Sequence, residues 1–413
     1  RHMSSGVTVV GPSIGDLIEA NGVAAHFQPI VSARQRSVMG FEALARGVSG
    51  GSTPLTAAAL FSMAAEASLT KTLERLCCEV SIQGFAALTR SRPELILFLN
   101  LGSWVGSNPS KYVAELSQFV ERAQLSPHRI AIEILETKSE SLSQLVAVTD
   151  GLRDSGFLLA LDDVGVGHSN LDRIALIRPD VVKVDRGLVT GIDGDFFKQE
   201  ALNCLSSLCR KIGALVVAEG VETADEAIVA LELGADMLQG YFFAPATVDG
   251  AFKRDDGTVA DIDVLAQAFK RHMVGKVEHR RSQQRQLTTV MDSLLDRLTL
   301  AEGHQFERLL KDTSGEHHDV ECVYVLDGSG TQITSTIVAK YFSSRVGILF
   351  QPAPRGADHS LKDYYYVPLE AGLPRYTSDP YVSLASGHLC RTLSTSFRDR
   401  RNDPYVLCID VLC

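Results

Sequence analysis

Residues 157–163 read FLLALDD, an apolar run that ends in two aspartates, Asp162 and Asp163. A β-strand that is buried on both faces has such a run, because helices cover both faces of a parallel sheet. Other apolar runs in the first 250 residues end in the same way: VMGF at Glu42, LILFL at Asn100, IAI at Glu133, ALVVA at Glu219 and DML at Gln239. The carboxyl ends of the strands of a (β/α)8 barrel meet at one rim, where active sites are built. We therefore expect these polar side chains to meet at one mouth of such a barrel.

Five of these expected neighbours carry carboxylates: Glu42, Glu133, Asp162, Asp163 and Glu219. Two like charges ~4 Å apart repel by about 4 kcal/mol at an effective dielectric of about 20. Divalent cations ordinarily compensate such a cluster, because their preferred ligands are oxygens. Two cations held side by side form a site that cleaves phosphodiesters. The pattern therefore predicts a two-metal hydrolytic site.

Length, charge and cysteine usage narrow the class of protein. The chain has 413 residues, which fits a barrel of about 250 residues with a smaller module. Its net charge of −10 argues against binding a DNA or RNA duplex through a basic face, although bound metals would admit an anionic substrate. No apolar stretch approaches the ~18 residues of a membrane span. The eight cysteines show no disulfide or zinc spacing, so we expect a cytoplasmic protein with reduced thiols.

Strand-like and helix-like patterns alternate through residues 15–252, as a barrel requires. The expected strands are 25–31, 38–45, 95–101, 130–135, 158–162, 181–184, 214–218 and 237–238. The expected helices are 56–67, 71–88, 112–123, 141–155, 170–176, 196–212 and 224–233. The first two strands are joined by SARQRS, which is too short for a helical crossover, so we expect the first strand to be antiparallel.

The rest of the chain predicts a linker and a second domain. A long helical pattern covers residues 261–312, with an apolar stripe of Leu287, Met291, Leu294, Leu295 and Leu298. From residue 318 to 413 the pattern changes to strands and turns, with a hairpin that turns at Asp327–Gly328. We expect an α+β domain there.

Eight segments of the first domain, taken together, resemble the EAL-type cyclic di-GMP phosphodiesterase family. They are FQPIVS (27–32), FEALAR (41–46), FLNL (98–101), IEILE (132–136), LDDVGVGHSNL (161–171), VVKVDR (181–186), VAEGVET (217–223) and LQGYFFAPA (238–246). Any one segment alone would mean little, but eight in the family's order are specific. The resemblance implies a barrel that opens cyclic di-GMP to linear pGpG with two Mg²⁺ or Mn²⁺ ions.

The resemblance also implies roles for single residues. The positions that match the family's metal ligands are Glu42, Asn100, Glu133, Asp162, Asp163 and Glu219. The catalytic set comprises Glu42 and Glu219 with Lys183, Gln239 and Glu136. Lys183 matches a lysine near the attacking water, although it could instead merely offset the acid cluster. Gln239 matches a residue that supports water and substrate, and Glu136 matches an acid that holds the loop after Asp163.

Four further positions match substrate-contacting residues of the family: Gln28, Leu44, Arg46 and Glu222. Arg46 lies two residues beyond Leu44, so both side chains point to one face of a strand. The planar guanidinium of Arg46 suits a phosphodiester. Taken singly, several of these residues could instead be surface acids or strand caps.

The loop after Asp163 departs from the family. It reads VGVGHSN, where the usual wording is close to FGTGYSS, so Val166 replaces a residue whose hydroxyl could anchor the loop. In many relatives this loop couples metal binding to dimerisation, so we expect a homodimer with altered coupling. The change leaves open a catalytically silent cyclic di-GMP receptor that signals through the linker helix. A scaffold that works through protein contacts alone is a third alternative.

The C-terminal residues 318–413 resemble, more loosely, the PAS/Cache-like sensory module that follows some EAL domains. The resemblance rests on VYVLDGSG, KDYYYVPLEAG, SDPYVSLASGHLCRTLSTSF and VLCIDV. This part has an aromatic cluster of Tyr364, Tyr365, Tyr366, Tyr376 and Tyr381, together with Arg375 and Arg391. They could line a pocket for an unknown small ligand, or the tyrosines could simply pack a core.

Overall fold

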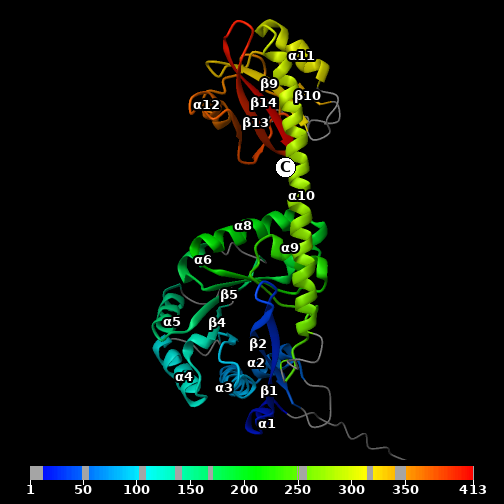
Figure 1. Cartoon of the computed structure of the whole chain (residues 1–413). Coiled ribbons are helices and arrows are strands. Elements are labelled where there is room, and N and C mark those ends of the chain that lie inside the picture. The colour runs from blue at the N-terminus through cyan, green and yellow to red at the C-terminus, as the bar shows by residue number, and fades with distance from the viewer. Residues whose placement is uncertain are drawn as a thin grey trace, which may run out of the picture. The chain divides into compact units, whose positions relative to one another are not determined.

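The computed structural model describes most of the chain, in residues 13–48, 55–101, 108–134, 142–165, 171–248, 250, 258–313, 320–339 and 350–412. The chain divides into two compact units, Arg1–Gly275 and Lys276–Cys413 (Figure 1). Each unit has a sheet and a hydrophobic core of its own. No helix in the described ranges is long and apolar enough to cross a membrane.

The first unit is a closed barrel whose eight strands follow each other in sequence order. The strands are β1 (Val23–Ser32), β2 (Ser37–Gly47), β3 (Ile96–Asn100), β4 (Ile130–Ile134), β5 (Leu158–Val164), β6 (Val181–Val184), β7 (Leu215–Ala218) and β8 (Met237–Leu238). Strand β1 is antiparallel to both β2 and β8, and the other neighbours are parallel. The predicted fold class, including the antiparallel first strand, is confirmed.

Helices cover the outside of the barrel, as Figure 1 shows. They are α1 (Ile14–Glu19), α2 (Ala57–Glu66), α3 (Thr70–Leu88), α4 (Pro109–Arg122), α5 (Leu142–Asp154), α6 (Leu171–Ile177), α7 (Arg186–Val189), α8 (Phe196–Ile212) and α9 (Ala224–Glu232). Each of the seven predicted helices coincides with one of these, whereas the short helices α1 and α7 were not predicted. Helix α8 shows how the sequence sets the ends. The Asp195 side chain accepts hydrogen bonds from the first-turn amides, and Gly213 closes the helix at φ 81°.

Strand β4 illustrates how the barrel core is built. Its residues Ile130, Ile132 and Ile134 pack outward against the helices, whereas Ala131 and Glu133 face the barrel interior. The inward-facing apolar residues of seven strands form a buried layer: Ile30, Phe98, Ala131, Ala160, Val181, Val217 and Met237. This layer fills the barrel beneath the mouth.

Helix α10 (Thr258–Leu298) is 41 residues long and contributes to both cores. Ile262 and Leu265 belong to the core of the barrel, and Leu294 and Leu298 belong to the core of the second unit. Where one helical stretch was predicted over 261–312, the structure has two helices, α10 and the separate, shorter α11 (Phe306–Thr313). The predicted apolar stripe lies in the second core, where its members are buried or half-buried.

The second unit is built on a six-stranded antiparallel sheet, which we call the sheet domain. Its strands run in the order β10-β9-β14-β13-β11, and β12 also pairs with β13. Their bounds are β9 (Val320–Asp327), β10 (Ile337–Val338), β11 (Arg375–Thr377), β12 (Tyr381–Val382), β13 (Leu389–Arg398) and β14 (Pro404–Leu412). Helices α10 and α11 pack on one face, and α12 (Asp363–Leu369) lies on the other. The predicted α+β domain is present, and its assignment as a PAS/Cache-like sensor stays a prediction.

Candidate metal and substrate site

A layer of polar side chains lies directly above the apolar layer of the barrel. Successive side chains of a strand alternate between the two faces, so the residue two positions after an inward-facing residue also points inward. Applied to six parallel strands, this rule gives Asn100, Glu133, Asp162, Lys183, Glu219 and Gln239. Strand β1 runs the other way, so its inward polar residue, Gln28, precedes Ile30 by two. The prediction that these side chains meet at one mouth therefore follows from the strand register.

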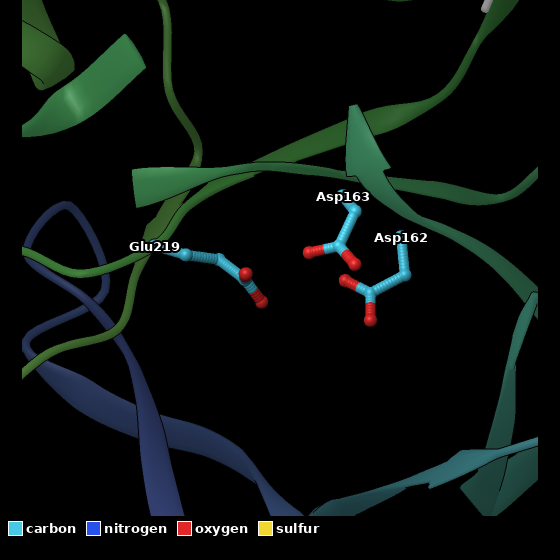
Figure 2. Close-up of side chains that lie close together, drawn as sticks. All are labelled: Asp162, Asp163 and Glu219. Atoms are coloured by element: carbon cyan, nitrogen blue, oxygen red, sulfur yellow. The ribbon is translucent and has the colours of Figure 1, made fainter. Parts of the chain in front are cut away.

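A β-bulge places two consecutive carboxylates on the same side of β5. The register of β5 against β6 shifts between Leu161 and Val164, and Asp163 has a φ of 55°. Figure 2 shows Asp162 and Asp163 extending from β5 toward Glu219, which follows β7. One ligand oxygen from each of the three lies within 4.8 Å of the others. Without the bulge, strand alternation would send Asp163 away from the mouth.

The ammonium group of Lys183 lies at the centre of four carboxylates. Its Nζ is 2.5 Å from Glu133 Oε1 and 2.6 Å from Glu219 Oε1. It is 3.2 Å from Glu42 Oε2 and 3.3 Å from Asp162 Oδ1. The lysine side chain is only 1% exposed and Glu133 is fully buried. The chain thus supplies one positive charge to the acid cluster from within.

Burial dominates the protonation of the acids. It raises the pKa of Glu133 well above its usual value and raises the pKa of Asp162, with neighbouring carboxylates adding to both shifts. Burial likewise raises the pKa of Glu219 to about 8. Burial alone would lower the pKa of Lys183, but the surrounding carboxylates outweigh it and hold that pKa well above its ordinary range. The single positive charge of Lys183 is therefore not enough to hold the pKa values of Glu133, Asp162 and Glu219 at their ordinary values.

Gln239 contacts the Glu42 carboxylate directly and links it to Gln28. Gln239 Nε2 donates hydrogen bonds to Glu42 Oε2 at 2.6 Å and to Gln28 Oε1 at 3.2 Å. Gln28 Nε2 in turn donates to the carbonyl oxygen of Ala244 at 3.1 Å. This chain of amides links β1, β2 and β8 across the mouth and fixes the orientation of the Glu42 carboxylate.

A cavity of about 300 Å³ opens beside the acid cluster. Its lining residues are Gln28, Glu42, Leu44, Asp163, Asp185, Arg186, Glu219, Gly220, Glu222, Gln239, Gly240 and Tyr241. Of the predicted substrate residues, Gln28, Leu44 and Glu222 line it. Sequence reasoning assigned no site role to Asp185, Arg186 or Tyr241. All three follow β6 or β8, with Arg186 at the first position of α7, so the strand-end rule that found the acids could have found them.

Local contacts hold the loops around this cavity. The carboxylate of Glu226 accepts hydrogen bonds from the backbone amides of Gly191, Glu222 and Thr223, which fixes the start of α9 beside the mouth. The loop after β8 packs so closely on the loop after β7 that a Cβ at Gly240 would lie 2.0 Å from the Val221 carbonyl oxygen. Only glycine fits there.

Two predicted site residues, Asn100 and Arg46, do not line the cavity beside the acids, and a third falls outside the described residues. Asn100 lines a neighbouring cavity of about 320 Å³ together with Leu44, and does not line the cavity beside the acids. The Arg46 guanidinium donates a hydrogen bond to the carbonyl oxygen of Ala45 and lines neither cavity. Glu136 lies outside the described residues, as do Val166 and His168 of the variant loop.

The donors in the mouth fit hard divalent cations. Glu133 Oε2 and Gln239 Oε1 are buried and have no hydrogen-bond partner among the described residues. A buried polar atom without a partner is costly, so such atoms commonly mark the place of a ligand or ion. Every predicted ligand offers an oxygen, as Mg²⁺ and Mn²⁺ prefer, and no cysteine or histidine belongs to the set.

The fold and the acid-lined mouth define the class of protein. Residues 13–246 match the model of the EAL domain, and the chain therefore belongs to the EAL domain family. The resemblance predicted from the eight sequence segments is thus confirmed.

Relatives of the chain include both named phosphodiesterases and an uncharacterised protein. This chain is 26% identical over 239 residues to the probable cyclic di-GMP phosphodiesterase PdeB of Escherichia coli. The match covers 58% of this chain and 45% of PdeB. The chain is 24% identical over 403 residues to the uncharacterised EAL-domain-containing protein YkuI of Bacillus subtilis, covering 93% of this chain and 94% of YkuI. The chain spans 45% of the length of PdeB and 60% of the length of the cyclic di-GMP phosphodiesterase RocR of Pseudomonas aeruginosa, which is less than two thirds of either protein.

A solved structure of YkuI shares the fold of both units. That crystal structure is of the YkuI protein in complex with substrate c-di-GMP and calcium. The match has a TM-score of 0.78 at 23% identity and covers 98% of this chain and 100% of that one. At this identity the likeness establishes the fold.

Proposed function

We propose that this chain hydrolyses cyclic di-GMP to linear pGpG with two divalent ions, Mg²⁺ or Mn²⁺. The observation that carries the proposal is the polar layer at the barrel mouth, where buried carboxylate and amide oxygens have no partner within the described residues. Membership of the EAL family and relatives named cyclic di-GMP phosphodiesterases support the same substrate.

The residues that would hold the ions are Glu42, Asn100, Glu133, Asp162, Asp163 and Glu219. Bound divalent ions would lower the pKa of a coordinated water and offset the charge of the phosphodiester. The raised pKa values of Glu133 and Asp162 support this assignment, because these acids bind protons or cations more readily than isolated carboxyls do.

The other residues of the mouth would orient the reacting groups. Lys183 stays protonated in the described arrangement, so it acts as a hydrogen-bond donor and a positive charge there. A cation placed beside the ammonium would lower its pKa, because like charges disfavour each other. Gln239 donates hydrogen bonds to Glu42 and to Gln28, while Leu44 and Glu222 line the cavity that would take the nucleotide. Arg186, which also lines it, adds a guanidinium suited to a phosphate.

We also propose that the sheet domain modulates the barrel. The support is the continuity of α10, a single helix that contributes side chains to both cores. Homodimerisation, the cytoplasmic location and the role of Glu136 stay predictions.

The test is the product formed by the purified chain from cyclic di-GMP with Mg²⁺ or Mn²⁺, identified by chromatography. We compare Glu42→Gln, which keeps the shape of the side chain, with Glu66→Gln, an exposed acid on α2. We expect pGpG from the unmodified chain and from Glu66→Gln, and at least about 100-fold less from Glu42→Gln, since even a residue that only supports a metal ligand costs about 10–100-fold.

Other outcomes would select the alternatives. Tight nucleotide binding without pGpG in either metal would contradict hydrolysis and favour the silent receptor. Calorimetry that shows no binding of nucleotide or metal would favour a scaffold.

A further inference from the structure

A second cavity lies within the sheet domain, on the face of the sheet that carries α12. Its volume is about 360 Å³. Strands β9 and β14, which neighbour each other in the sheet (Figure 1), supply Cys322, Tyr324 and Asp410. The chain around α12 and β12 supplies His359, Tyr364 and Tyr381. The cavity therefore draws its walls from four separate elements of one domain.

The walls of this cavity are aromatic. The rings of Tyr364 and Tyr381 are stacked with centroids 6.3 Å apart, and Tyr324 meets Tyr364 edge-on at 6.4 Å. The imidazole of His359 lies 5.5 Å from the Tyr324 ring. Hydrogen bonds fix these groups, because Tyr364 Oη pairs with His359 Nδ1 at 2.9 Å and His359 Nε2 pairs with Gln332 Oε1 at 3.0 Å. The rings are thus held in place before any ligand binds.

A buried carboxylate forms one end of the cavity. Asp410 is 5% exposed, and its Oδ1 accepts hydrogen bonds from Thr392 Oγ1 at 2.7 Å and from Tyr324 Oη at 3.5 Å. Its Oδ2 accepts a hydrogen bond from Cys322 Sγ at 3.2 Å. All three donors are neutral, so they orient the carboxylate without balancing its charge.

A second buried carboxylate, that of Glu321, lies near Asp410 but is not among the groups that line the cavity. Glu321 is fully buried where the register between β9 and β14 shifts, next to the pairing of Asp410 with Cys322. Its Oε1 accepts a hydrogen bond from Ser383 Oγ at 2.6 Å, and Ser383 lines the cavity. Its Oε2 is buried and has no hydrogen-bond partner among the described residues. Glu321 is close enough to Asp410 to help raise the pKa of that acid, after burial itself.

Neither carboxylate has a cationic side chain within 4.0 Å in the described part of the chain. Lys362 also lines the cavity, but its residue is exposed and forms no ion pair with either acid, so it stands at the rim. Burying an unpaired charge is expensive, so buried charges are usually paired with an opposite charge or coordinate a metal. The alternative is a polar network that only stabilises the core of the domain. That alternative does not explain why Glu321 Oε2 has no hydrogen-bond partner among the described residues.

We propose that this cavity binds a small organic ammonium ion, with its charge toward Asp410 and its carbon groups against Tyr324, Tyr364 and Tyr381. Ring faces attract cations within about 6 Å, and a carboxylate adds a charge-assisted contact. A neutral ligand would leave the Asp410 carboxylate without a counter-charge, and an anionic ligand would be repelled by it. The cavity volume is in the range that holds small molecules.

The first experiment uses the full chain without nucleotide or divalent ions, so that its outcome does not depend on the phosphodiesterase proposal. Calorimetry compares choline and ethylammonium with dimethylbutanol, the carbon analogue of choline that has the same shape and no charge. We expect saturable binding of at least one of the two cations and binding of the neutral analogue weaker by about tenfold or more. Equal binding of choline and dimethylbutanol, or no binding of either cation up to tens of millimolar, would overturn the proposal.

Substitutions of residues that line the cavity then test whether the cation binds there. Asp410→Asn keeps the shape of the side chain and removes its charge, and Tyr364→Leu removes a ring. We expect each to weaken binding by about 10- to 100-fold, while Glu370→Gln, an exposed acid of the same domain outside the cavity, binds as the unmodified chain does. Circular dichroism checks that each variant is folded, and unchanged affinity in a folded Asp410→Asn and a folded Tyr364→Leu would remove the site from this cavity.

A Lys362 variant distinguishes two classes of ammonium ligand: simple cations and zwitterionic amino acids. A simple cation should bind Lys362→Met at least as tightly as the unmodified chain, because a like charge is removed. A zwitterionic amino acid, tested as glycine, should bind Lys362→Met more weakly, because its carboxylate loses a partner. Either result is consistent with an ammonium site and identifies which ligand class fits. Binding of both classes that ignores Lys362 and Asp410 alike would contradict the proposal.

Discussion

The mouth of the barrel and the cavity of the sheet domain both bury carboxylates at an irregular strand register. In the barrel, a bulge in β5 brings Asp162 and Asp163 to one side, and Lys183 contacts four acids. In the sheet domain, the shift between β9 and β14 lies beside Glu321 and Asp410, and neutral hydroxyl and thiol groups are their donors. The barrel thus balances part of its charge internally, whereas the sheet domain leaves its charge to solvent, protons or a ligand.

The buried acids of both regions lower the stability of the fold, so we expect their role to be the binding of a cation or ligand. Burial raises the pKa of Asp162 in one region and of Asp410 in the other, which means that each ionised acid costs folding free energy. Such an acid is costly unless a proton, a cation or another ligand compensates its charge. The following experiments test whether both regions follow this rule.

The largest expected effect is the loss of the internal cation of the barrel. Lys183→Met leaves four carboxylates around an apolar side chain, so we expect the barrel to lose about 3–5 kcal/mol of unfolding free energy in chelator. Added Mn²⁺ should restore part of that loss, because it supplies the missing charge. Denaturant unfolding measures both, with Lys211→Met, an exposed lysine on α8, as the control. An unchanged unfolding midpoint for Lys183→Met would show that the lysine does not balance the acids.

An acid of the cluster should behave in the opposite way. Asp162→Asn resembles the protonated form that burial favours, so we expect it to be as stable as the unmodified chain, or more stable, in chelator. Its turnover of cyclic di-GMP should nevertheless fall by at least about 100-fold, because a proposed metal ligand is lost. Thermal unfolding and product chromatography on the same sample give the two results. A stability loss with full turnover would make Asp162 a structural residue.

The sheet domain should show the cost of its buried acid as a dependence on pH. The pKa of Asp410 is raised from 3.8 to about 6 in the folded chain. The cost, about 2–3 kcal/mol, is fully present above pH 6 and disappears as the pH falls toward 4. We therefore expect this acid to favour folding increasingly as the pH is lowered from 7 to 4.

Comparison with Asp410→Asn isolates that contribution from the other groups around the cavity. His359 works in the opposite direction, because burial lowers its pKa and its protonation at acid pH disfavours the fold. Glu321, Lys362 and the cavity tyrosines are the same in both proteins. Denaturant unfolding at pH 7 and pH 5, followed by tyrosine circular dichroism, should show a smaller gain at pH 5 in the variant. Equal pH slopes would contradict a buried ionised Asp410.

The smallest effect concerns one hydroxyl. Tyr381 Oη pairs with Thr392 Oγ1 at 2.6 Å, and Thr392 donates to Asp410. Tyr381→Phe keeps the ring and removes the hydroxyl, so we expect a loss of about 1 kcal/mol in the unfolding of the sheet domain. Choline binding, which would use the ring face, should change much less than in Tyr364→Leu. A larger loss of binding in Tyr381→Phe would place the hydroxyl at the ligand.

Much of the site could be predicted from the sequence because strands obey a short-range rule. A polar residue that follows a buried apolar run lies at the rim of the barrel. This rule predicted the positions of Glu133, Asp162 and Glu219 from the sequence alone. The same rule could have added Arg186 and Tyr241. That rule describes parallel barrel strands and does not apply to the antiparallel sheet domain, whose cavity uses Tyr364 and Tyr381 of the predicted tyrosine cluster together with Asp410 and His359, which the sequence did not single out.

What the sequence determined by itself is the barrel, its antiparallel first strand and the family, since alternation along each strand and the order of the motifs are properties of neighbouring residues. Only the tertiary structure decided how charge is arranged. The bulge at Asp163, the position of Lys183 among four acids and the pairing of Glu321 with Ser383 depend on contacts between residues far apart in the chain. Those contacts set burial and distance, and burial and distance determine whether a carboxylate needs a proton, a lysine or a ligand.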